Sequence, residues 1–291
     1  MFSKRTQRMQ TIDAHQHLWA ISERTYSWIT PDYSELHRDF TFQDFLIASK
    51  NSAIDGTVLV QSADTYEDTF YMLHVASGNS LIRGVVGWVP LDRPEEAKAA
   101  LNLFRRIPQF KGVRNLTHDY SNSKYESDDR WILRREVLTT LKQIAEDGLT
   151  WDYVAVNQAH LESVIDVATQ IPNLRIVIDH FGKPNIAEQI IEPWQGLIKE
   201  CSTHQNIHIK FSGLNTASRS GWQASDWQPY FEIVYENFGP ERILVGGDWP
   251  VITLMDNYQK VWDAQMQIIA KLPLREQILI RGGNAVQFYK L

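Results

Sequence analysis

The sequence predicts an α/β protein, a single (β/α)8 barrel of the TIM type. Eight segments with the composition of buried strands alternate with eight helical segments, at intervals of roughly 20 to 40 residues. Strands such as 175–178 have no polar face, which is typical of a sheet covered on both sides. The chain of 291 residues has no break in composition, so a closed barrel in one domain, 1–291, is favoured over a doubly wound sheet.

Four strand and helix pairs are predicted in the first half of the chain. Thr41 has the side chain of a helix N-cap, and the run from Gly56 to Gln61 is apolar, as in a buried strand. The same alternation then repeats with regular spacing. The expected strands are 10–17, 56–61, 83–89 and 111–116, and the expected helices are 41–52, 66–77, 94–106 and 134–147.

The second half keeps this alternation. The expected strands are 150–156, 174–180, 207–213 and 243–248, and the expected helices are 159–170, 192–204, 227–238 and 256–272. A turn and a short helix in 274–291 end the chain. A closed barrel requires the strands 10–17 and 243–248 to be hydrogen-bonded neighbours.

Two segments fall outside the alternation. Residues 1–9 are basic but no apolar stretch follows them, so we expect a disordered leader and not a signal peptide. Residues 18–40 show neither helical nor strand period, and a loop of this length is unusual unless it has a function. We expect it to form a wall or lid over the active site, using its aromatic residues Trp19, Tyr26, Trp28 and Tyr33.

Composition points to a soluble enzyme with a small-molecule partner. The formal charge of −6 provides no basic surface for nucleic acid or for an anionic membrane, and no apolar run reaches the ~18 residues of a membrane span. The single cysteine, Cys201, cannot form an internal disulfide, which fits the cytoplasm. Ten Trp and eleven Tyr residues suit a site that binds polar rings such as sugars.

Polar residues gather at the carboxyl ends of the predicted strands, the rim where such barrels place their active sites. His15 and His17 project to one face of their strand, roughly 7 Å apart along it. Two imidazoles in one place can bind a metal or donate hydrogen bonds to an oxygen that becomes negative. The other polar or aromatic strand ends are Arg114, Asp152, Tyr153, Asp179, His180, Lys210, Ser212, Asp248 and Trp249.

Four motifs carry a resemblance that covers nearly the whole chain. In order, they are Ile12–His17 (IDAHQH), Asp179–Pro184 (DHFGKP), Lys210–Leu214 (KFSGL) and Gly247–Pro250 (GDWP). With these motifs the sequence resembles the amidohydrolase superfamily, and more narrowly its sugar-acid lactonases and the related 2-pyrone-4,6-dicarboxylate and muconolactone hydrolases. Tyr26–Trp28 and Arg38–Phe40 are similar to the lactonases of the L-fucono- and L-rhamnonolactone type. The resemblance implies a hydrolase that opens a lactone ring.

Departures from the superfamily pattern restrict the metal content. A two-metal site needs a Lys or Glu at the end of the fourth strand and a His at the end of the fifth. This sequence has Arg114 and Tyr153 in those regions. A single zinc or other divalent ion is compatible with His15, His17, His180 and Asp248. The branch includes lactonases that need no metal, so no cofactor is expected to be required.

Ester hydrolysis assigns roles to these residues. Asp248 is the expected general base, ionised at neutral pH, and a pKa raised by burial would make it a better proton acceptor without protonating it fully. The expected hydrogen-bond donors to the carbonyl are His15, His17, His180 and Tyr153. The expected substrate-binding residues are Trp28, Arg114, Lys210 and Trp249. For Lys210, an ion pair inside the barrel beneath the site is an equally good interpretation.

Two other functions stay open. Metal-dependent decarboxylases share the barrel and the His-x-His motif, although the flanking segments of this chain resemble the lactonases. A non-catalytic binding barrel would keep the aromatic loop but would not need a carboxylate facing the histidines, so Asp248 argues against it.

Overall fold

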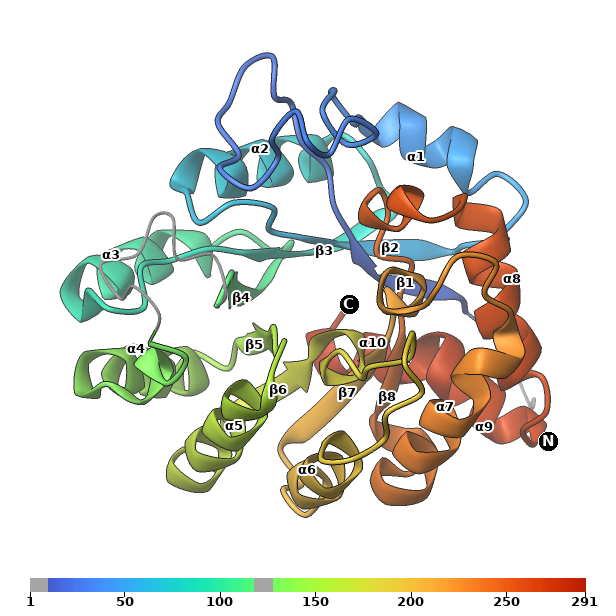
Figure 1. The fold of residues 1–291 in the computed structure, drawn as a ribbon. Helices are drawn as coiled ribbons and strands as arrows, with labels where there is room; N and C mark the ends of the chain where they lie inside the picture. The colour runs from blue at the N-terminus through green and yellow to red at the C-terminus, as the bar shows by residue number, and fades with distance from the viewer. Residues whose placement is uncertain (1–9, 118–127) are drawn as a thin grey trace, which may run out of the picture.

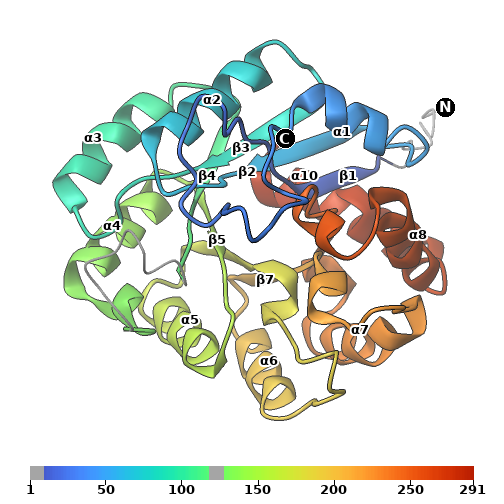
Figure 2. The same ribbon diagram turned by 45° about the horizontal axis from the view of Figure 1, so that its top comes forward.

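The computed structural model describes residues 10–117 and 128–291, and confirms the predicted barrel. Eight parallel strands pair in chain order, and Figures 1 and 2 show the helices arranged around them. The strands are β1 (Ile12–Gln16), β2 (Gly56–Val60), β3 (Ile82–Gly87), β4 (Phe110–Asn115), β5 (Thr150–Tyr153), β6 (Arg175–Ile178), β7 (Ile207–Phe211) and β8 (Ile243–Val245). The expected leader, 1–9, lies outside the described residues.

Each strand is followed by a helix that covers the outside of the sheet. None of the helices in 10–117 and 128–291 has the length and apolarity needed to cross a membrane. The helices are α1 (Phe42–Ala48), α2 (Tyr66–Ser77), α3 (Pro94–Phe104), α4 (Arg135–Glu146), α5 (Gln158–Gln170), α6 (Trp194–Ser202), α7 (Ala224–Phe238), α8 (Tyr258–Ile269), α9 (Leu274–Ile278) and α10 (Asn284–Tyr289). The expected N-cap, Thr41, accepts a hydrogen bond from the backbone of Asp44.

The barrel closes at the rim between β1 and the segment that follows β8. The backbone N–H of Asp248 donates to the carbonyl of His15, and that of His17 donates to the carbonyl of Trp249, each over 2.7 Å. The two ends of the sheet are therefore neighbours, as predicted. β8 itself stops at Val245, before the expected residue 248, and Asp248 has a φ of 57°, outside the range of strand residues.

Helix α10 covers the opposite, amino-terminal mouth of the barrel. Phe288 and Tyr289 pack in one buried cluster with strand residues that include Ile12, Val58 and Leu244. This cluster fills the interior below the rim with apolar side chains, as barrels of this type require. The last helix therefore extends the core beneath the active site, and the C-terminus lies close to the centre of the ring of strands in Figure 1.

Segment 18–40 contains no regular helix or strand, as expected. It is fixed by an antiparallel bridge between Trp19 and Phe40. The indole N–H of Trp28 donates to the carbonyl of Ser62, just beyond the end of β2, over 2.7 Å. Phe40 packs edge-on against Trp249, with ring centroids 5.4 Å apart. The segment is thus attached to the rim beside the ends of β2 and β8.

Asp13 on β1 joins the two ends of the sheet and bonds to helix α8. Its Oδ1 accepts hydrogen bonds from the backbone N–H of Gly247 (2.7 Å) and of His15 (3.0 Å), and its Oδ2 accepts from the hydroxyl of Tyr258 (2.7 Å). Burial raises the pKa of Asp13 to about 6, although these donors act in the opposite direction. Asp13 therefore fixes the strand that carries both histidines of the His-x-His motif.

Asp13→Ala is expected to lower the free energy of unfolding by about 3 kcal/mol, because three buried donors lose their acceptor. Asp13→Asn retains an oxygen and should lose only about 1 kcal/mol, because burial already disfavours the charged form. Chemical denaturation of the two variants and the wild type measures both values. Loss of less than about 0.5 kcal/mol in Asp13→Ala would contradict this role.

Candidate active site

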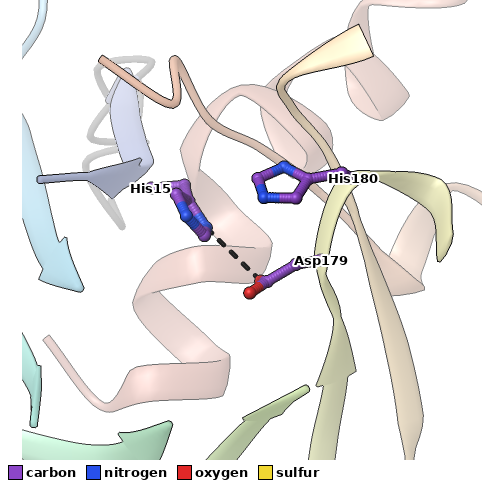
Figure 3. A group of neighbouring side chains, drawn as sticks. All are labelled: His15, Asp179 and His180. Carbon is purple, nitrogen blue, oxygen red and sulfur yellow. Dashed lines mark ion pairs between the residues drawn. The ribbon is translucent and has the colours of Figure 1, made fainter. Parts of the chain in front are cut away.

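Three histidines and one aspartate from the ends of β1, β6 and β8 meet at the carboxyl rim. The Nε2 atoms of His15 and His17 lie 3.0 Å apart, and Oδ1 of Asp248 lies 3.6 Å from the former and 3.3 Å from the latter. Nδ1 of His180 lies 3.9 Å from Oδ2 of the same carboxylate. Figure 3 shows the rings of His15 and His180 beside each other, with centroids 4.7 Å apart. The structure thus brings together four of the predicted site residues.

Left-handed backbone conformations turn these side chains into the site. His180 has a φ of 54° directly after β6, and Asp248 has a φ of 57° after β8. Such values cost a residue with a side chain of order 1–3 kcal/mol and are found where function requires the position. Gly213 follows β7 with a φ of 61°, and a Cβ there would lie 2.5 Å from Oδ2 of Asp248 and 2.7 Å from Nδ1 of His180. A glycine is therefore required at 213 for these two groups to approach each other.

A buried ionic cluster lies directly beneath His15. Nζ of Lys210 is 2.5 Å from Oδ2 of Asp152, 3.1 Å from Oδ1 of Asp179 and 3.0 Å from Nδ1 of His15. Nε of Arg114 donates to Oδ2 of Asp179 over 2.8 Å. Two cations and two carboxylates balance one another, which is the condition for keeping charges in a core.

Burial and neighbouring charges shift the pKa values of the site. Burial, together with the ammonium of Lys210, holds the pKa of His15 well below its usual range. Burial lowers the pKa of His180 to about 4. Both imidazoles are thus neutral at pH 7. Burial acts to raise the pKa of Asp248, but His180, His17 and His15 outweigh it and lower this pKa below the usual value. The expectation of a raised pKa for Asp248 is therefore wrong, since the imidazoles supply more stabilisation than burial removes.

One predicted donor points elsewhere. Tyr153 was expected to reach the carbonyl, but its hydroxyl donates to the backbone carbonyl of His160 at the start of α5, over 3.0 Å. Asp152 points into the barrel toward Lys210, and successive side chains of a strand alternate, so Tyr153 faces the helices. The prediction for Tyr153 is corrected on this ground.

The predicted substrate-binding residues occupy different depths. Lys210 is fully buried and pairs with Asp152 and Asp179, which is the interior ion pair given above as the alternative to substrate binding. Trp249 is 3% exposed and packs on Phe40 and Phe45. The guanidinium of Arg114 is bonded to Asp179 and also donates to the backbone and side-chain oxygens of Gln61. Trp28 is partly exposed and belongs to segment 18–40, where its ring packs edge-on against Trp19.

Several residues of the cluster were not assigned a role from the sequence. Asp179 and Asp152 were noted as strand ends, but their partners come from other strands and cannot be read from spacing. The hydroxyl of Tyr289 in α10 donates to Oδ2 of Asp152 over 2.6 Å, and no sequence signal indicates this contact. Ser212 lies 2.9 Å from Nδ1 of His180 and orients that ring.

Comparisons with known proteins agree with this geometry. The amidohydrolase family model matches residues 12–291. This chain belongs to the amidohydrolase family. It is 35% identical over 284 residues, 96% of this chain and 95% of the relative, to an L-fucono-1,5-lactonase of Burkholderia ambifaria. It is 27% identical to an L-fucono-1,5-lactonase of Burkholderia multivorans, over 96% of each chain.

A solved amidohydrolase structure has the same fold as this chain. A crystal structure of an amidohydrolase from Burkholderia multivorans with bound zinc superposes with a TM-score of 0.88 at 26% identity, covering 97% of this chain and 99% of that one. This amidohydrolase therefore shares its fold with that structure.

The chemistry of the site fits one divalent ion. Within the described part of the chain, two buried groups have ligand atoms within 4.8 Å of one another, namely His15, His17 and Asp248, and His15, Asp179 and His180. Two imidazoles and a carboxylate suit zinc. Nδ1 of His17 lies 2.8 Å from the carbonyl of Val60, which can only accept, so the Nε2 of a neutral His17 carries the lone pair that a metal requires.

Gly213→Ala is expected to lower kcat/KM by about 10- to 100-fold, because the added methyl displaces Asp248 and His180. Backbone strain should also lower the free energy of unfolding by about 1 kcal/mol. Gly221→Ala is the matched control, since Gly221 also has a positive φ, of 77°, but nothing lies within 4 Å of its added methyl. The control should lose similar stability and keep its activity; equal loss of activity in both variants would contradict the crowding argument.

Proposed function

We propose that this amidohydrolase opens the ring of a sugar-acid lactone of the L-fucono-1,5-lactone type by hydrolysis. The observation that carries the proposal is the carboxylate of Asp248, whose oxygens lie 3.3 to 3.9 Å from ring nitrogens of His15, His17 and His180 at the rim of the barrel. The relative that is 35% identical over nearly the full chain is a lactonase, which supports the same substrate class. Decarboxylation and simple binding, the other functions considered, have no such support.

Hydrolysis of a lactone requires a base beside a water molecule and donors around the carbonyl oxygen. Asp248 takes a proton from water as the water oxygen bonds to the carbonyl carbon. When the ring C–O bond breaks, the same proton passes to the ring oxygen, which leaves as a hydroxyl of the product hydroxy acid. The lowered pKa of Asp248 keeps it ionised at neutral pH, so its basicity comes from position and not from a raised pKa.

Segment 18–40 is proposed as the wall that closes over the sugar. The hydrogen bond of Trp28 to Ser62 beyond β2, and the packing of Phe40 on Trp249 beyond β8, support this proposal. An aromatic face with one polar edge suits the C–H face of a sugar ring. Arg114 is proposed to contribute to substrate binding by holding Asp179 and Gln61 in position. Trp249 is proposed to support the loop by its packing against Phe40.

One zinc or another divalent ion is proposed to bind on His15, His17, His180 and Asp248 without being required. When bound, such an ion would act as a Lewis acid on the lactone carbonyl. Ester carbonyls are electrophilic enough for hydrogen-bond donors to suffice, and the imidazoles around Asp248 are the proposed donors.

The test of the substrate class is a panel of aldonolactones incubated with the purified protein while acid release is followed. L-Fucono-1,5-lactone is expected to be opened faster than 1,4-lactones and lactones of other configuration. Aromatic carboxylic acids, tested for loss of CO2, serve as the comparison. Release of CO2 without lactone opening would replace the proposal by the decarboxylase, and tight binding without turnover would replace it by a binding protein.

Asp248→Asn is expected to reduce kcat by about 10²- to 10⁴-fold, because the amide fills the same space but cannot take the proton from water. Circular dichroism and denaturation of the variant check that the fold is kept. Wild-type turnover by Asp248→Asn on the best lactone would exclude Asp248 as the base.

Thorough chelation is expected to leave most of the lactonase activity. Metal content is measured on the same samples, so that activity can be compared with occupancy. Zinc found in the purified protein would not by itself decide the mechanism, since such a ligand set captures zinc during purification. Activity that disappears on chelation and returns in proportion to added zinc would make the ion a required cofactor.

A further inference from the structure

The contacts of His15 determine which of its ring nitrogens carries the proton. A lysine ammonium has three donors and no acceptor. Nζ of Lys210 lies 3.0 Å from Nδ1 of His15 in hydrogen-bonding geometry, so this ring nitrogen must accept. The proton of the neutral ring is then on Nε2, the atom that faces the site.

The next contact agrees independently with this assignment. Nδ1 of His17 donates to the carbonyl of Val60 over 2.8 Å, which leaves a lone pair on Nε2 of His17. The Nε2 atoms of His15 and His17 are 3.0 Å apart, so a donor on one must meet an acceptor on the other. A proton on Nε2 of His15 satisfies this condition. Hydrogen bonds therefore run in one direction, from Lys210 through His15 and His17 to Val60.

We infer that Lys210 is a positioning residue that holds the proton of His15 on Nε2, and thereby makes His15 a hydrogen-bond donor to His17 and weakens it as a ligand of the ion proposed above. An imidazole can coordinate a metal only through a nitrogen without a proton. Coordination by Nε2 of His15 would move the proton to Nδ1, toward Oδ1 of Asp179 at 3.3 Å, and break the contact with Lys210. The role of His15 toward a lactone carbonyl rests on the proposed function, but the position of the proton does not.

The rest of the cluster keeps the ammonium in place. Lys210 is fully buried, and Oδ2 of Asp152 accepts from both Nζ of Lys210 and the hydroxyl of Tyr289. The hydroxyl of Tyr289 bonds to Asp152 and not to His15, which provides a control within the same network.

The test uses protein labelled with 15N in its histidines and stripped of metal, studied by long-range 1H–15N correlation. The signals of His15 are assigned by their absence in His15→Gln. In the wild type the proton of His15 is expected on Nε2. In Lys210→Met, which removes the donor but keeps an extended side chain, the proton is expected on Nδ1.

Zinc affinity gives the second readout. Competition with a chromogenic chelator should show that Lys210→Met binds zinc about 10- to 100-fold more tightly than the wild type, the usual size of effects from partners of a metal ligand. Tyr289→Phe should keep both the wild-type tautomer and the wild-type zinc affinity. If Lys210→Met does not fold, Lys210→Met with Asp152→Asn removes one charge of each sign and is measured in its place.

Three results would overturn the inference: a proton on Nδ1 of His15 in the wild type, an unchanged tautomer after removal of Lys210, or an unchanged zinc affinity. None of these measurements depends on lactone turnover. A protein that gives the expected spectra and affinities but opens no lactone would refute only the proposed function.

Discussion

The balanced ion cluster at the centre of the barrel is the interaction on which the active site depends. The ammonium of Lys210 and the guanidinium of Arg114 compensate the carboxylates of Asp152 and Asp179, all of them buried. Removing one partner from such a set leaves an uncompensated buried charge. This loss lowers the free energy of unfolding by far more than the intact set adds to it. The cluster therefore fixes the side chains above it, and His15 above all.

Two layers of the barrel interior thus have different chemistry. The lower layer, closed by α10, is apolar and supplies the burial that stabilises the closed sheet. The upper layer is charged and hydrogen-bonded, and its groups are paired across strands that are far apart in sequence. Tyr289 connects the layers, because it packs in the apolar cluster while its hydroxyl bonds to Asp152.

The electrostatics of the rim follow from this arrangement. The positive charge of Lys210 below His15 and the burial of all the rings keep the histidines His15 and His180 neutral, and their polar atoms stabilise the negative charge of Asp248. The site thus holds the ionised carboxylate of Asp248 beside the neutral imidazoles of His15 and His180, and each group has its ordinary charge for pH 7. Left-handed conformations at His180 and Asp248 are the conformational cost of this geometry, and the packing around Gly213 maintains them.

The sequence by itself determined the barrel, because eight apolar strands alternating with helices have few ways to bury both faces of a parallel sheet. It also placed His15, His17, His180 and Asp248 at one rim, because parallel strands deliver their carboxyl ends to the same side. Strand periodicity could not show that β8 ends before Asp248 or that Asp248 has a positive φ, because contacts with other strands determine the backbone there.

Only the tertiary structure decided what each polar side chain meets. The outward direction of Tyr153, the burial of Lys210 and the sign of the pKa shift of Asp248 all depend on neighbours contributed by distant strands. Such pairings have no local signal, since a carboxylate at a strand end looks the same in the sequence whether it faces water, a lysine or three imidazoles. The direction of the hydrogen bonds from Lys210 through His15 to His17 could therefore be inferred only from the contacts in the folded barrel.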